Sequence, residues 1–127
     1  MPITFSMNHE GGYFVAHYKG AISDRDVDEW KSYHSGIDLM PNINQLADLS
    51  DADLSGVTTT GIQAIADYFI FIYREYNITS MKTAIYAPQT LSFGLSRMYE
   101  ALAYETAQDI EIFNDREKAI QWLTAGK

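Results

Sequence analysis

Short strand-like runs alternate with longer segments of helical periodicity along almost the whole chain. The first two runs are separated by an asparagine and two glycines, which suit a hairpin turn. Each later run is followed by a segment with apolar residues three or four positions apart. The predicted strands are 3–7, 13–20, 44–50, 81–88 and 109–113, and the predicted helices are 23–37, 58–77, 89–105 and 115–123. This order predicts a single α/β domain over residues 1–127, with an N-terminal β-hairpin leading into a mostly parallel five-stranded sheet with four helices.

The predicted helices have apolar stripes and recognisable ends. Ser23 and Asp115 are placed to cap the first and last helix, because a short polar side chain accepts a hydrogen bond from a free N–H of the first turn. The stripes predicted to face the sheet are Val27, Trp30, His34 and Ile37 in 23–37, then Ile62, Ile65, Phe69, Ile72 and Tyr76 in 58–77, and Leu91, Leu95, Met98 and Leu102 in 89–105. One face of each helix is therefore expected to be buried.

The charge balance bears on the class of partner. Nine basic and seventeen acidic side chains give a net charge of -8, which argues against a nucleic acid or an anionic membrane as partner. No cysteine is present, which excludes disulfides and thiol chemistry. No run reaches the ~18 apolar residues of a membrane span, and the start of the chain does not resemble a secretion signal. We therefore expect a cytoplasmic protein without a membrane span.

The stretch Thr58–Thr59–Thr60–Gly61 stands where the long second helix is expected to begin. Unpaired N–H groups and the positive end of the helix dipole would favour a phosphate or another anion there, and a glycine would allow close approach. A regulatory switch or anion-binding turn is therefore one interpretation. The other is that Thr58 or Thr59 only caps the helix. Both predict that Thr59 lies near solvent in the first helical turn.

The chain contains "LADLS" at 46–50, "TTTGI" at 58–62 and, nearer its end, "FGLSRMYEAL" and "IEIFNDREKAIQWL". Together these segments resemble the SpoIIAA-like fold family, which contains the STAS domains. The segment "TTTGI" at 58–62 follows "LADLS" at 46–50 in the way that an Asp-Ser-Ser-Gly-Leu type motif follows a strand in STAS anti-sigma-factor antagonists. The closing "FGLSRMYEAL" and "IEIFNDREKAIQWL" resemble the SpoIIAA-like branch. The resemblance implies that Thr59 corresponds to the phosphorylated serine. Thr58 replaces the aspartate of the antagonists, which removes a carboxylate expected beside that hydroxyl, and the loop after Asp48 is longer.

Acidic residues after the third strand form a second candidate site. Asp48, Asp51 and Asp53 would lie at the carboxyl edge of the sheet, where open α/β folds bind ligands, and carboxylates of this kind hold magnesium. The alternative is a solvated acidic loop. Arg97 would add an anchor for a carboxylate or phosphate at this ligand edge, or would simply pair with Glu100.

Other chemistry is not indicated. The three histidines, at positions 9, 17 and 34, lack the spacing of metal ligands, and the sequence has no Ser-His-Asp order, phosphate loop or dinucleotide motif. We expect no metal, no cofactor and no catalytic residues.

Apolar residues surround the second helix on more than one side. Phe69, Ile72 and Tyr73 fill the sheet-facing positions, and the remaining large apolar side chains are Tyr68, Ile70 and Phe71. A surface helix is seldom apolar nearly all round, so this side is predicted to be an interface with a second copy of the chain, another protein or an apolar ligand. The alternative is a helix that is deeply buried within the monomer.

The resemblance and the missing catalytic motifs favour a non-enzymatic regulatory or protein-interaction module of STAS type, controlled at the turn from Thr58 to Gly61. The alternative is a small-molecule or lipid-like ligand-binding protein, because the resemblance extends loosely to lipid-carrying domains. An enzyme using the acidic edge and Arg97 is a third hypothesis.

Overall fold

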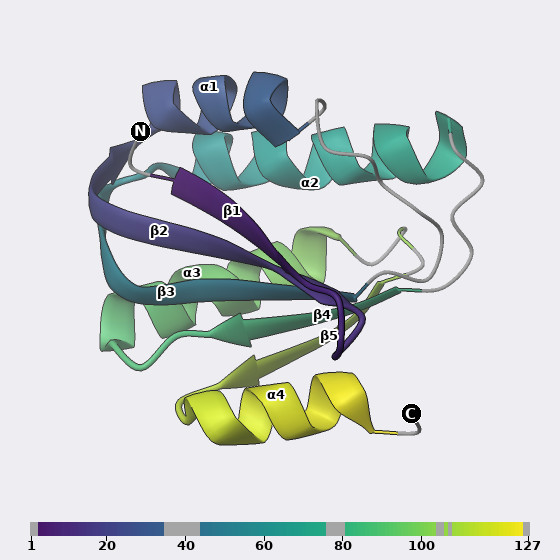
Figure 1. The fold of residues 1–127 in the computed structure, drawn as a ribbon. Helices are drawn as coiled ribbons and strands as arrows, with labels where there is room; N and C mark the ends of the chain where they lie inside the picture. Colours follow the sequence, from purple (N-terminus) through teal and green to yellow (C-terminus); the bar gives the residue numbers. More distant parts are fainter. Residues whose placement is uncertain (1–2, 35–43, 76–80, 104–105, 107, 126–127) are drawn as a thin grey trace.

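A computed structural model describes residues 3–34, 44–75, 81–103, 106 and 108–125 of the chain (Figure 1). Its elements follow the predicted order, with five strands and four helices. The strands are β1 (Ile3–Asn8), β2 (Tyr13–Ser23), β3 (Asn44–Gly56), β4 (Met81–Tyr86) and β5 (Gln108–Phe113), and the helices are α1 (Asp24–His34), α2 (Thr59–Glu75), α3 (Thr90–Leu102) and α4 (Arg116–Thr124).

The sheet is mixed, with the strands side by side in sequence order from β1 to β5. β1 and β2 form an antiparallel hairpin, whereas β2–β3, β3–β4 and β4–β5 are parallel pairs. A mixed sheet thus replaces the expected mostly parallel one. The physical reason is the tight turn between the first two strands, where Asn8 Oδ1 accepts a hydrogen bond from the Gly11 N–H (2.8 Å) and Gly12 adopts a φ of 69°. The later strands are joined by helices, which return the chain to the same end of the sheet.

The helices divide unequally between the two faces of the sheet. From β2 to β5 the chain adds each strand on the same side of the previous one. Right-handed crossovers then place α1, α2 and α3 on one face of the sheet. α4 follows the last strand and lies on the other face, below the sheet in Figure 1. The larger core lies on the three-helix face, and a smaller one joins α4 to the sheet.

The third strand is longer than the sequence pattern suggested. It continues to Gly56, so the predicted acidic loop is part of a strand, with Asp51 paired to Lys19 and Asp53 paired to Ala21. Side chains alternate along this extension: Ala52 and Leu54 are buried, and Asp51, Asp53 and Ser55 are exposed. The β2 strand extends to Ser23 to supply the pairing partners.

The predicted helix ends and the inner side of α2 are confirmed. Ser23 Oγ accepts from the Asp26 N–H (3.4 Å), and Asp115 Oδ1 accepts from the Lys118 N–H (3.2 Å). Of the predicted α2 stripe, Ile62, Phe69 and Ile72 are buried and Ile65 is half-buried. Tyr76, Ile37 and the side chains of Trp30 and His34 lie outside the described residues.

The predicted stripe of α3 is wrong at its first residue, Leu91, whereas Leu95, Met98 and Leu102 are half-buried and pack against the larger core. Leu91 is 50% exposed, and the buried line is instead Ser92, Ser96 and Tyr99. Both serines donate to helix carbonyls, Ser92 to Gln89 O (3.0 Å) and Ser96 to Ser92 O (2.7 Å). A serine satisfied in this way behaves as a small residue, which allows the helix to approach the sheet closely.

Candidate functional site

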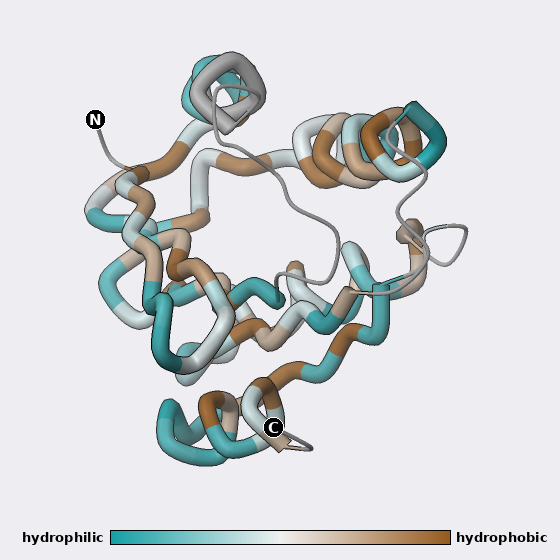
Figure 2. Tube along the Cα trace, turned by 45° about the vertical axis from the view of Figure 1, so that its right-hand side comes forward, coloured by the Kyte–Doolittle hydropathy of each residue, from teal (hydrophilic) through white to brown (hydrophobic). Residues whose placement is uncertain are grey.

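A cavity of about 90 Å³ lies between the sheet and the helices of the larger core. Its walls come from four of the five strands, β1–β4, and from the helices α1, α2 and α3. Hydrophobic positions recur along α2 and the inner strands (Figure 2). Among the described residues that line the cavity, none has a charged side chain. The site is therefore an apolar chamber that is partly open to solvent.

The cavity exists because α2 stands away from the sheet. This helix packs chiefly on α1 and α3 rather than directly on the strands. Below it the lining includes short side chains, among them Ala47 on β3 and Ser96 on α3. Short side chains on the floor and a raised helix above it leave the space unfilled.

Most polar groups in the walls already have partners. Thr83 Oγ1 donates to Gln108 Oε1 (2.8 Å), and Gln108 Nε2 donates to the Tyr99 hydroxyl (3.0 Å). Ser96 donates to the backbone of its own helix. Burial raises the pKa of Tyr99 above its ordinary value, so its hydroxyl stays neutral. These groups fix the walls and leave their inner surface apolar.

Gln45 differs from these polar neighbours. It lines the cavity from β3 and is only 4% exposed. Within the described part of the chain, its side-chain amide has no hydrogen-bond partner. Gln45 is therefore the polar side chain of the cavity wall whose amide is not held by another described side chain.

The structure places Thr58 at the N-cap of α2 and Thr59 at its first residue. Thr58 Oγ1 accepts from the Gly61 N–H (3.3 Å), and the Thr58 carbonyl accepts from the Ile62 N–H (3.1 Å). The side chains of Thr58, Thr59 and Thr60 are exposed, as expected for a hydroxyl in the first turn, and Gly61 is buried. The capping geometry is therefore present at Thr58.

A carboxylate already occupies the start of this helix. Asp24, the first residue of α1, accepts a hydrogen bond from the Thr58 N–H (2.9 Å) and another from Thr58 Oγ1 (2.5 Å). A β-carbon at position 61 would collide with the Asp24 carboxylate. These hydrogen bonds, the side-chain one foremost, hold the pKa of Asp24 below its ordinary value of 3.8. An external anion would therefore have to displace Asp24.

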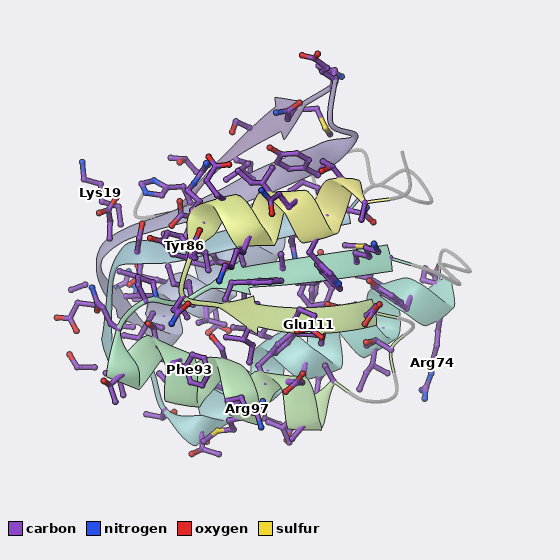
Figure 3. All side chains as sticks on the ribbon, turned by 90° about the horizontal axis from the view of Figure 1, so that it is seen from below. Lys19, Arg74, Tyr86, Phe93, Arg97 and Glu111 are labelled. Atoms are coloured by element: carbon purple, nitrogen blue, oxygen red, sulfur yellow. The ribbon has the colours of Figure 1, made fainter. Side chains whose placement is uncertain are left out.

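The predicted ligand-edge residues do not form one site. Asp48 faces α4, and its Oδ2 lies 3.5 Å from Arg116 Nε of that helix. Its Oδ1 accepts a hydrogen bond from Ser50 Oγ on the same strand (2.6 Å). Asp51 pairs with His17, with 2.9 Å between Oδ2 and Nε2. Arg97 lies on α3 (Figure 3), on the three-helix face of the sheet, whereas Asp48 pairs with Arg116 of α4.

Arg97 makes the ion pair that the sequence offered as the alternative, with 3.7 Å between its Nη1 and Glu100 Oε1. The third aspartate of the acidic group, Asp53, accepts from Ser55 Oγ (2.7 Å). Across the described ranges, no three acidic or histidine side chains are grouped to hold a metal ion.

The predicted interface on α2 is narrower than the sequence indicated. Phe71 is 60% exposed. Tyr68 is half-buried, packs against the larger core and meets Phe69 edge-on, with 5.6 Å between ring centroids. Ile70 is also half-buried. Two further large apolar side chains, Leu91 and Phe93, are exposed on α3.

Sequence reasoning missed both the cavity and two residues that shape these sites. Gln45 had a visible signal, because it alternates with Ala47 and Leu49 on the apolar side of a buried strand. The role of Asp24 at the start of α2 had none, because its partner Thr58 lies 34 positions away.

Together, the sequential mixed sheet and the three helices on one face define an α/β fold of repeating strand–helix units. The fold is SpoIIAA-like: the chain is similar to a crystal structure of an uncharacterised protein of the DUF3478 family with a SpoIIAA-like fold from Shewanella loihica. The TM-score is 0.56 at 19% identity, over 95% of this chain and 91% of the other. No family model and no curated protein matches the chain. The helices of the described ranges are too short or too polar to cross a membrane.

Proposed function

We propose that this chain is a non-enzymatic binding domain that holds a compact apolar molecule in the cavity beneath α2. The observation that carries the proposal is the cavity itself, which has uncharged walls built from seven elements of the fold. Sites for small molecules are typically apolar chambers with a few placed polar groups. Gln45 supplies such a group here.

The energetics support a bound molecule. An apolar molecule in this cavity would cover apolar wall surface, at about 25 cal/mol per Å² removed from water. The short side chain of Ala47 leaves room for such a molecule. A ligand of matching shape would also gain dispersion contacts with the walls.

Toluene tests this proposal, because it is small, apolar and uncharged. We expect it to bind the wild-type protein in a titration followed by NMR, and to raise the unfolding temperature. Ala47→Leu should fill the cavity and abolish both effects. The control is Ala101→Leu on the exposed side of α3, which should bind toluene like the wild type. Absence of toluene binding, or binding that survives Ala47→Leu unchanged, would contradict the proposal.

A second candidate is a regulatory interaction module of STAS type. The observation that favours it is Phe71, whose ring is 60% exposed on the outer side of α2. We propose a second copy of the chain as its partner, because two such rings would cover one another in a symmetric dimer. Phe71→Glu should then convert a dimer into a folded monomer, measured by analytical ultracentrifugation. A wild-type monomer would contradict this candidate.

The turn at the start of α2 would control this module. Thr59 is exposed, so its hydroxyl is accessible to modification. Thr59→Glu adds part of the charge of a phosphate beside the Asp24 carboxylate, and repulsion should loosen the contact between α1 and α2. Self-association should change relative to Thr59→Gln, which is similar in size and uncharged. Equal self-association in these two variants would leave Thr59 as an ordinary helix residue.

A further inference from the structure

We infer that the molecule held in the cavity is electrically neutral and carries one hydrogen-bonding group, and that the Gln45 amide recognises this group. This inference rests on the proposed function and specifies its ligand class. Three observations carry it: the Gln45 amide, which makes no hydrogen bond to another described residue, the position of Gln45 on the cavity floor, and the uncharged walls.

The amide of Gln45 is available for a ligand. It offers two N–H donors and one carbonyl acceptor, and none of them is used by the described residues. Thr83, Ser96 and Tyr99 line the same cavity, but each makes a hydrogen bond within the protein. Because Gln45 lines the cavity, a group that enters the cavity is the expected partner of this amide.

The position of Gln45 orients the ligand. In the sheet register, Gln45 lies between Phe14 on β2 and Thr83 on β4. Farther along β3, the lining residues are Ala47, Leu49 and Leu54. The hydrogen-bonding group should therefore sit over the first half of β3, with the apolar body extending toward the carboxyl end of the strand.

The walls select against charge. A carboxylate or ammonium in this cavity would lose its hydration without meeting an opposite charge among the described lining residues. The volume adds a size limit: at ~10–15 Å³ for each water-sized group, about 90 Å³ holds roughly six to nine such groups. Small aromatic alcohols, phenols, ketones and amides fit this description.

The test compares three probes that share one ring: toluene, benzyl alcohol and benzoate. We expect the wild-type protein to bind toluene and benzyl alcohol, and to bind benzoate at least about tenfold more weakly than benzyl alcohol. Gln45→Met keeps the length of the side chain and removes its hydrogen bonds. This variant should bind benzyl alcohol about five- to tenfold more weakly and toluene as well as the wild type.

The outcomes separate the two claims. If toluene does not bind the wild type, the proposed function fails and the inference fails with it. If toluene binds but Gln45→Met affects both neutral probes equally, the role of Gln45 is overturned and the cavity remains. If benzoate bound as tightly as benzyl alcohol, the claim that the ligand is electrically neutral would be overturned. If Gln45→Met fails to fold, the NMR resonances of the Gln45 side-chain amide in the wild-type protein test its role instead. Benzyl alcohol should shift these resonances, and toluene should leave them nearly unchanged.

Discussion

The Asp24 carboxylate accepts both the backbone N–H and the hydroxyl of Thr58, at 2.9 and 2.5 Å, and so joins the start of α1 to the start of α2. The carboxylate lies where a helix N-terminus favours negative charge. The protein thus supplies its own anion at the start of α2, namely the Asp24 carboxylate of α1. Because Val27 on α1 and Ile62 on α2 line the cavity, the same contact also fixes one end of the binding chamber.

Gly61→Ala should destabilise the fold, because the added β-carbon would collide with the Asp24 carboxylate. We expect a loss of about 1–3 kcal/mol in urea unfolding. Gly94→Ala on α3 is the matched control: its β-carbon meets nothing within 4 Å, and we expect a gain of about 0.5–1 kcal/mol. In an Asp24→Ala background, the cost of Gly61→Ala should largely disappear. An equal cost in both backgrounds would show that Asp24 is not the cause.

Thr58→Ala should cost about 1 kcal/mol of unfolding free energy, because it removes the helix cap. Thr59→Ala should stay within ~0.5 kcal/mol of the wild type, since that side chain is exposed and is not the cap. Chemical denaturation of the two variants checks this. Equal losses would mean that the cap is not specific to Thr58.

Asp24 should make the protein less stable in acid. Its pKa is lowered in the folded state, so its stabilising contribution is present above the ordinary value of 3.8 and is lost as the pH falls through the lower folded value. Asp24→Asn cannot titrate, and its unfolding midpoint should approach that of the wild type as the pH falls from about 5 to about 2. If the difference between the two unfolding midpoints stayed constant with pH, the hydrogen-bonded carboxylate of Asp24 would not be its cause. An NMR titration of Thr58→Ala should show the pKa of Asp24 rising toward 3.8.

Two buried tyrosines should respond oppositely to loss of their hydroxyls. The Tyr73 hydroxyl is buried without a hydrogen-bond partner in the described structure, and burial raises its pKa. Tyr73→Phe should therefore leave stability unchanged or raise it by up to about 1 kcal/mol. Tyr99→Phe removes the acceptor of Gln108 and should cost about 1 kcal/mol. Thermal unfolding of both variants tests this contrast, and a destabilised Tyr73→Phe would contradict it.

Local patterns were sufficient to predict the elements and their order. The helix caps at Ser23 and Asp115 and the inner residues of α2 follow from spacing within single segments. The sequence also contained the alternation that extends β3, in which Ala52 and Leu54 alternate with Asp51, Asp53 and Ser55. The acidic residues after Ser50 suggested a loop, but this segment forms a strand because it pairs with the end of β2.

The sites were harder to predict because they depend on contacts between distant segments. Leucine spacing on α3 suggested an inward Leu91, but Ser92 and Ser96 face the sheet because their hydroxyls are satisfied within the helix. The contact between Asp24 and Thr58 joins two helices. The cavity depends on how far α2 stands from the sheet, and no local pattern encodes this distance.

Intermolecular NOEs from toluene to labelled methyl groups test the binding cavity most directly. We predict cross-peaks from the toluene protons to Leu49, Ile62 and Ile85, which line the cavity from β3, α2 and β4. Leu91, which is exposed on α3 and lies outside the cavity, should show none. Cross-peaks confined to Leu91 and other surface methyls, or no cross-peaks at saturating toluene, would contradict the account.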